Sequence, residues 1–129
     1  MQGLTTEIHG TATAYASLKN LHSIIDNLLG NYASLARRTQ ENPPHLSITL
    51  SEENGQALSM IQDLNGSPYT RPERLFEPFW SEQAEGLGIG LYQARQLAVN
   101  ESGSLDFLAP PDKPLTFVLK LPGPKTDLS

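Results

Sequence analysis

The segment GLGIGLYQARQL, residues 86–97, places three glycines on alternate positions directly before a helical pattern. Apolar residues then recur at helical spacing to about Glu101, and Ser102-Gly103 is a typical stop signal. Free backbone N–H groups and the positive end of a helix dipole suit an anion at such a turn. A flexible turn would have the same pattern, so both interpretations stand here. The glycine spacing excludes the dinucleotide-binding fingerprint, and a Walker loop would need a lysine after the last glycine.

Two regions upstream of these glycines have clear periodicity. From about residue 14 to 38 apolar side chains recur every three or four positions, which predicts a long amphipathic helix. Its expected apolar stripe consists of Leu18, Leu21, Ile24, Ile25, Leu28, Leu29, Tyr32 and Leu35. Residues 46–51 alternate between apolar and polar, Asn54-Gly55 supplies a tight turn, and residues 57–63 form the returning strand, which together predict a β-hairpin over residues 46–63.

The remaining segments complete the order of elements. Residues 4–9 predict a short first strand, and residues 105–109 and 115–121 predict a closing antiparallel pair. Residues 64–85 contain three prolines and predict a loop with one helical turn near residues 72–76. The order of strand, helix, hairpin, loop, helix and hairpin favours an α+β fold with helices on one face of a mixed or antiparallel sheet.

Composition limits the classes of protein to which the chain can belong. Its 129 residues suffice for one domain, expected over residues 1–129. A net charge of −5 provides no basic patch, so neither nucleic acid nor direct contact with a membrane is expected. No cysteine occurs, which excludes a disulfide framework and suits the cytoplasm.

A few polar residues are candidates for binding. Asn27 and Asn31 are four positions apart, so both lie on one face of the predicted helix and can offer amide oxygens to one ligand. Such a pair is also common at the boundary of an ordinary amphipathic helix. Asp63 ends the predicted hairpin, where its carboxylate can accept a hydrogen bond from the amino group of a base or bond its own backbone.

The histidines and the loop aromatics carry weaker signals. His9, His22 and His45 have no metal-binding spacing, and we expect solvated or capping roles for them. The aromatic side chains of the loop could clamp it to the core or line a mobile lid, and anchoring is favoured; they are Phe76, Phe79 and Trp80.

Over nearly the whole chain, the order of these features resembles the ATP-binding catalytic domain of sensor histidine kinases, in the clan shared with gyrase B, the Hsp90 chaperones and the MutL proteins. The resemblance rests on an asparagine box at IIDNLLGNYASLA (24–36), a first glycine box at MIQDLNG (60–66), a phenylalanine box at RLFEPFW (74–80) and a second glycine box at GLGIGLYQARQLA (86–98). It implies a two-layer α/β sandwich of the Bergerat type, with a mixed, largely antiparallel sheet.

The resemblance also implies roles for individual residues. Asn31 would be the ligand of Mg²⁺, and Asn27 its catalytic companion that orients the reacting phosphate. Asp63 would contact the adenine amino group of ATP, and Gly66, the glycine of the same box, would lie at the nucleotide as well. The second glycine box would form the hinge of a short lid between Trp80 and Gly90 and face the phosphates, through Gly86, Leu87, Gly88, Gly90 and Leu91.

The implied activity is transfer of the γ-phosphate of ATP to a histidine. That histidine would lie on a separate dimerisation domain of the same kinase, and a downstream response regulator would receive the phosphate next. The dimerisation and sensor domains are expected to be absent from this chain, and the isolated domain is expected to be monomeric. The expected location is the cytoplasm, including the cytoplasmic part of a membrane-bound sensor.

Three departures from the family pattern keep alternatives open. In the first glycine box, Asn65 and Ser67 stand where glycines are usual, and the glycine is displaced to Gly66. In the asparagine box, Tyr32 replaces an alanine. In the lid, Glu82-Gln83 replaces a threonine-lysine pair. One alternative is a degenerate Bergerat-fold domain with weak or no ATP binding that acts as a protein-interaction module. The other is a serine kinase of the anti-sigma-factor type.

Overall fold

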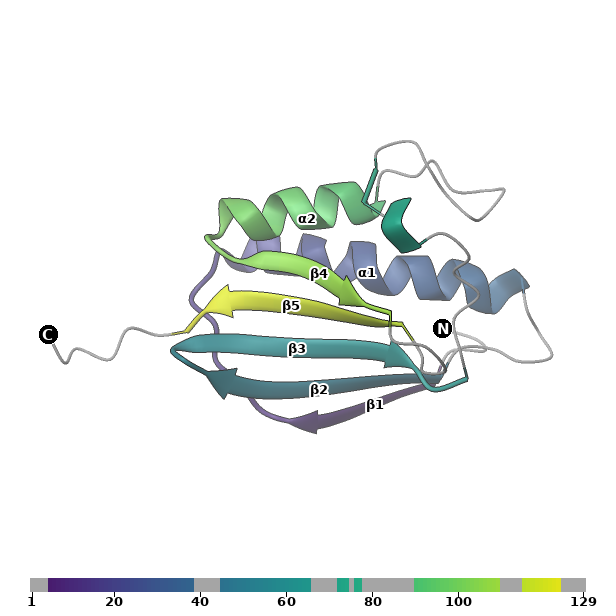
Figure 1. The fold of residues 1–129 in the computed structure, drawn as a ribbon, viewed down its shortest axis with the longest axis horizontal. Helices are drawn as coiled ribbons and strands as arrows, with labels where there is room; N and C mark the ends of the chain where they lie inside the picture. The colour runs from purple at the N-terminus through teal and green to yellow at the C-terminus, as the bar shows by residue number, and fades with distance from the viewer. Residues whose placement is uncertain are drawn as a thin grey trace, which may run out of the picture.

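A computed structural model describes residues 5–38, 45–65, 72–74, 76–77, 90–109 and 115–123 of the chain. In this part, one five-stranded sheet is covered on one face by two helices (Figure 1). The strands lie in the order β1 (Thr5–Gly10), β2 (His45–Glu53), β3 (Gln56–Asp63), β5 (Thr116–Pro122) and β4 (Ser104–Leu108). The helices are α1 (Leu18–Arg38) and α2 (Gly90–Asn100), with a single 3₁₀ turn, η1, at Pro72–Arg74. The predicted order of elements and the α+β class are confirmed.

The sheet is mixed because one strand pair differs from the others. β1 pairs with β2 in parallel, whereas the β2–β3, β3–β5 and β5–β4 pairs are antiparallel. A parallel pair needs a long crossover connection, and α1 lies between the two strands in the chain and provides it. This arrangement confirms the mixed, largely antiparallel sheet expected from the sequence.

The β2–β3 hairpin fixes where Asp63 lies. Asn54 and Gly55 both have positive φ, 53° and 78°, as a two-residue type I′ turn requires. The tight turn sets the register so that Leu46 pairs with Asp63 and Ile48 with Ile61. Since Leu46 and Ile61 are buried in the core under the helices, Asp63 lies on the covered face of the sheet.

The hydrophobic core lies between the two helices and this face of the sheet. Ile24 and Leu28 of α1 are fully buried, and so are Ala94 and Ala98 of α2. The sheet contributes Leu46, Ile61, Leu105, Phe117, Leu119 and Leu121, while Leu115 joins from directly before β5 and Leu91 from the first turn of α2. None of the helices in the described part is long and apolar enough to cross a membrane.

The beginning of α1 differs from the prediction. The helix begins at Leu18 rather than near residue 14, and Leu18, expected in the apolar stripe, is 68% exposed. Tyr15 instead donates its backbone N–H to the carbonyl of Pro122 at 2.7 Å, which holds this connection against β5. Ser17 then caps the helix, so the buried stripe starts one turn later than its sequence period indicated.

The end of α2 is a Schellman turn. Gly103 N–H donates to the carbonyl of Ala98 at 2.8 Å, and Ser102 N–H donates to that of Val99 at 2.9 Å. The left-handed position is occupied by Ser102, with φ of 65°, rather than by glycine. Gly103 is required by packing, because a Cβ there would lie 2.1 Å from the carbonyl oxygen of Lys120 in β5. The predicted stop at Ser102-Gly103 is therefore confirmed.

Candidate functional site

Asn27 of α1 lies beside the first residue of α2. The helices run antiparallel (Figure 1), and a methyl group added at Gly90 would lie 3.7 Å from the side-chain oxygen of Asn27. The first turn of a helix carries backbone N–H groups without helical partners and the positive end of the helix dipole. An amide oxygen and a helix N-terminus are thus brought together from two distant segments of the chain.

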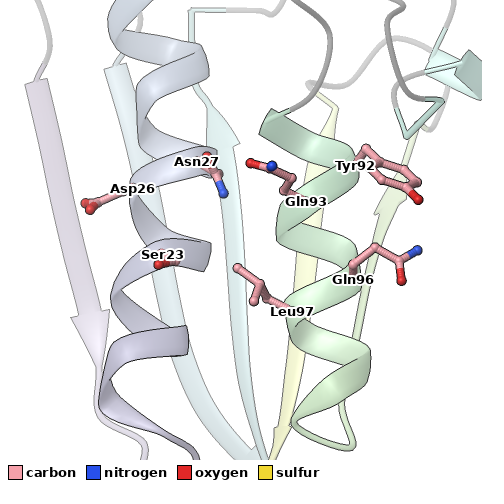
Figure 2. A pocket seen from close by; sticks show the side chains of 7 residues that line it. All are labelled: Ser23, Asp26, Asn27, Tyr92, Gln93, Gln96 and Leu97. Atoms are coloured by element: carbon pink, nitrogen blue, oxygen red, sulfur yellow. The ribbon is translucent and has the colours of Figure 1, made fainter.

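Asn27 also lines a groove between the two helices. The groove has a volume of about 470 Å³, within the range typical of small-molecule sites. In Figure 2 the side chains of Asn27 and Gln93 point toward one another across it. Most of its lining residues are of polar types: Ser23, Asp26 and Asn27 from α1 and Tyr92, Gln93, Gln96 and Leu97 from α2. The α2 residues were not among the candidates from the sequence, although their spacing of three to four positions places them on one face of a helix.

Asp63 is a buried carboxylate at the end of β3, with 1% of its surface exposed. One oxygen, Oδ1, accepts the backbone N–H of His45 at 2.9 Å and that of Asn65 at 3.0 Å. The bond from Asn65 closes the local turn in which this aspartate was expected to bond its own backbone. The bond from His45 connects Asp63 to the start of β2. Asp63 therefore has a structural role, and two bonds do not exhaust the roughly four acceptor positions of a carboxylate.

The other predicted site residues are only partly described. Asn31 belongs to α1, one turn after Asn27, but its side chain lies outside the described residues. Leu91 is in the first turn of α2 with its side chain in the core, so only its backbone can face a ligand. The positions that lie outside the described residues are Gly66, Gly86, Leu87 and Gly88, together with the rest of the implied lid before Gly90.

Phe76 of the phenylalanine box is anchored to the core, as expected. Its ring lies 6.2 Å from the rings of both Phe107 and Phe117, measured between centroids. The guanidinium of Arg95 in α2 stacks over the same ring at 4.4 Å, and Arg95 Nη2 lies 2.6 Å from Asp106 Oδ1. No local motif indicates Arg95, because its partners come from other segments of the chain. Phe79 and Trp80 lie outside the described residues.

Another group of titratable side chains lies on the open face of the sheet. Glu7 contacts the imidazoles of both His9, at 3.4 Å, and His45. The parallel register of β1 and β2, which pairs Thr5 with His45, creates this cluster, so no local motif predicted it. In the described part of the chain, no set of three or more His, Cys, Asp or Glu side chains is arranged to hold a metal ion.

Comparison with known proteins identifies the class to which this fold and site belong. Residues 16–125 match the family model of the histidine kinase-, DNA gyrase B- and HSP90-like ATPases. Because the match spans most of the chain, the protein belongs to this family.

Within the family, similar proteins include sensor proteins and sensor kinases. The chain is 28% identical over 89 residues to the sensor protein kinase PilS of Pseudomonas aeruginosa, covering 67% of this chain and 17% of PilS. It is 26% identical over 108 residues to the sensor protein SrrB of Staphylococcus aureus, covering 78% of this chain and 18% of SrrB. Its fold matches the mycobacterial sensor histidine kinase MprB with a TM-score of 0.72 and 23% identity, covering 96% of this chain and 85% of that structure. The chain thus spans less than a fifth of the curated relatives' length.

Proposed function

We propose that this chain is the ATP-binding catalytic domain of a sensor histidine kinase, which transfers the γ-phosphate of ATP to a histidine on a separate dimerisation domain. The observation that carries this proposal is the position of Asn27 beside Gly90, at the N-terminus of α2. β3, which Asp63 terminates, ends at the same end of the domain where α2 begins (Figure 1). Family membership over residues 16–125 supports the same function.

Asp63 is the proposed adenine contact. Its carboxylate is buried, and its orientation is set by the two backbone N–H groups that bond Oδ1. A carboxylate only accepts hydrogen bonds, so it recognises the exocyclic amino group of adenine, whereas guanine has an acceptor oxygen at that position. Asp63 would therefore select ATP over GTP without any movement of its own.

The phosphates are proposed to lie near Asn27 and the start of α2. The backbone N–H groups of Gly90 and Leu91 would donate to phosphate oxygens, and the dipole of α2 favours the same anion. The donor set fits Mg²⁺, which prefers oxygen ligands and needs few from the protein. Asn31 would hold the metal and Asn27 would orient the transferred phosphate, both from one face of α1. When bound, Mg²⁺ supplies positive charge that offsets the charge of the phosphate oxygens.

The remaining roles in this proposal depend on the resemblance and on partner proteins. Gly66, Gly86, Leu87 and Gly88 would shape the backbone around the nucleotide. The histidine on the dimerisation domain would accept the phosphate in line, and a response regulator would then receive it. Since the reaction uses ATP, we expect the domain to act in the cytoplasm. Catalysis by this chain would consist mainly of positioning the reactants.

Titration calorimetry with ATP tests the proposal. The wild-type chain should bind ATP more tightly with Mg²⁺ than with EDTA, and Asn31→Asp should weaken binding by tenfold or more, about 1.4 kcal/mol. Asn100→Asp makes the same chemical change on an exposed residue of α2 and should leave binding unchanged. Binding that survives Asn31→Asp would contradict the metal role, and no heat at millimolar ATP would contradict the function.

A second candidate is a protein-interaction module that does not bind nucleotide. It is favoured by Asn65 and Ser67, which stand where the family usually has glycines beside the adenine-binding aspartate. Asn65 donates the backbone N–H that closes the turn at Asp63, so any change in backbone path there acts at the base-binding end of the site. The same calorimetry separates the two candidates, because only the kinase domain gives heat with ATP.

A further inference from the structure

The helix pair is tied together at the end opposite to Asn27 and Gly90. Glu101, directly after α2, accepts the backbone N–H of Ser17 at 2.8 Å through Oε1 and the side-chain amide of Asn20 at 2.6 Å through Oε2. Both donors belong to the first turn of α1 and its cap. These bonds hold the pKa of Glu101 below its usual range, with the Ser17 N–H as the largest cause.

These bonds complete the cap of α1 with a residue from another helix. In a capping box, the cap serine accepts the N–H of the third helical residue, and a glutamate at that third position reaches back to the serine N–H. Here Ser17 Oγ accepts the N–H of Asn20 at 3.4 Å, so the first half is present. Asn20 stands where the glutamate would be, and Glu101 supplies the missing carboxylate from the end of α2.

The position of Glu101 is fixed relative to α2 and the sheet by hydrogen bonds of its own backbone and by the turn that follows it. Its N–H donates to the carbonyls of Leu97 and Ala98, both at 3.1 Å, and the Schellman turn follows at once. Gly103 in that turn packs directly on the carbonyl of Lys120 in β5. The start of α1 is thereby tied through Glu101 to the end of α2 and to the sheet.

We infer that Glu101 is a positioning residue that sets the axial register of α1 against α2, and with it the position of Asn27 relative to Gly90. The bonds of Glu101 and the approach of Asn27 to Gly90 lie at opposite ends of α2. A shift of α1 along its axis would break the bonds at Glu101 and move Asn27 away from the first turn of α2 at the same time. This inference rests on the proposed nucleotide site.

The test separates capping of α1 from positioning. Glu101→Ala removes the tie and the cap together. Adding Asn20→Glu to Glu101→Ala creates a capping box within α1, which restores the cap but not the link to α2. Glu53→Ala, which removes an exposed glutamate from β2, is the control. If Glu101→Ala does not fold, Glu101→Gln replaces it, because it keeps one acceptor for Ser17 and loses the one that faces Asn20.

Three quantities are measured on each variant: the Tm, the Kd for MgATP by calorimetry, and the distance between spin labels on α1 and α2. The chain has no cysteine, so His22→Cys and Val99→Cys introduce two labels at exposed positions without background. Glu101→Ala should lower the Tm, weaken MgATP binding about fivefold or more, and shift or broaden the label distance. The double variant should recover the Tm but neither the affinity nor the distance.

Recovery of affinity and distance in the double variant would overturn the inference, because Glu101 would then be only a cap. An unchanged label distance in Glu101→Ala would overturn it as well. If the wild-type chain binds no MgATP, the proposed function fails. The label distance in the nucleotide-free protein then still decides whether Glu101 sets the register of the helices.

Discussion

Replacing Asp63 with asparagine exchanges one carboxylate oxygen for an amide nitrogen at a position that is 1% exposed. The asparagine oxygen can still accept the backbone N–H groups of His45 and Asn65, but as a neutral acceptor. Bonds to charged groups contribute about 1.5–3 kcal/mol and neutral ones about 0.5–1.5 kcal/mol, so two bonds lose about 2 kcal/mol. Asp63→Ala removes the acceptor of both bonds, which costs about 2–6 kcal/mol.

The effect of Asp63→Asn on nucleotide binding should exceed its effect on stability. The new amide nitrogen donates where adenine also donates, so ATP affinity should fall by about 100-fold, which is about 2.7 kcal/mol. GTP, with an acceptor oxygen at that position, should lose much less. The ratio of the two dissociation constants therefore reports on the base contact alone, independent of any general loosening of the fold.

Urea unfolding and titration calorimetry with ATP and GTP measure the two effects separately. Asp106→Asn makes the same change on a carboxylate that is 61% exposed and should cost less than about 1 kcal/mol. An unchanged ratio of ATP to GTP affinity in Asp63→Asn would refute the adenine contact. A free energy of unfolding within 0.5 kcal/mol of wild type, taken as about the limit for a neutral substitution, would refute the structural role.

Three further substitutions test the surrounding geometry. Gly90→Ala adds a methyl group that, among the described residues, meets only Asn27, at 3.7 Å, so stability should change by less than about 0.5 kcal/mol in thermal unfolding while ATP affinity falls in calorimetry. Gly103→Ala places its Cβ 2.1 Å from the carbonyl oxygen of Lys120 and should cost about 1–3 kcal/mol or more in urea unfolding. Glu101 has a lowered pKa, so its contribution to stability is complete above its usual value of 4.5 and is lost as the pH falls through the folded value. The Tm of Glu101→Gln should therefore fall less steeply than that of wild type below about pH 4.5, measured by circular dichroism.

Features encoded in neighbouring residues were predictable. The Asn54-Gly55 turn has the positive φ angles that its sequence indicates, and the hairpin around it follows. The end of α2 at Ser102-Gly103 was likewise predictable, because glycine after a helical pattern commonly ends a helix. The order of these local signals also led to the correct family, because the four motifs follow one another along the chain in the order typical of that family.

Features that depend on distant partners were not predictable. Leu18 fits the apolar period of α1 and is nevertheless exposed, because the cap at Ser17 and the connection before it decide where the buried stripe begins. The stacking of Arg95 on Phe76 and the contact of Glu7 with His45 join segments that no local pattern relates.

The sequence by itself determined the elements, their order, the hairpin register and the family, since helical periodicity and turn chemistry act over a few residues. It also indicated Asn27 and Asp63 as candidates. Only the tertiary structure decided that Asn27 lies beside Gly90 and that Glu101 caps α1 from the end of α2. Such contacts depend on how two helices pack on one sheet, and the free energy of that packing is spread over a core drawn from both helices and from strands β2 to β5.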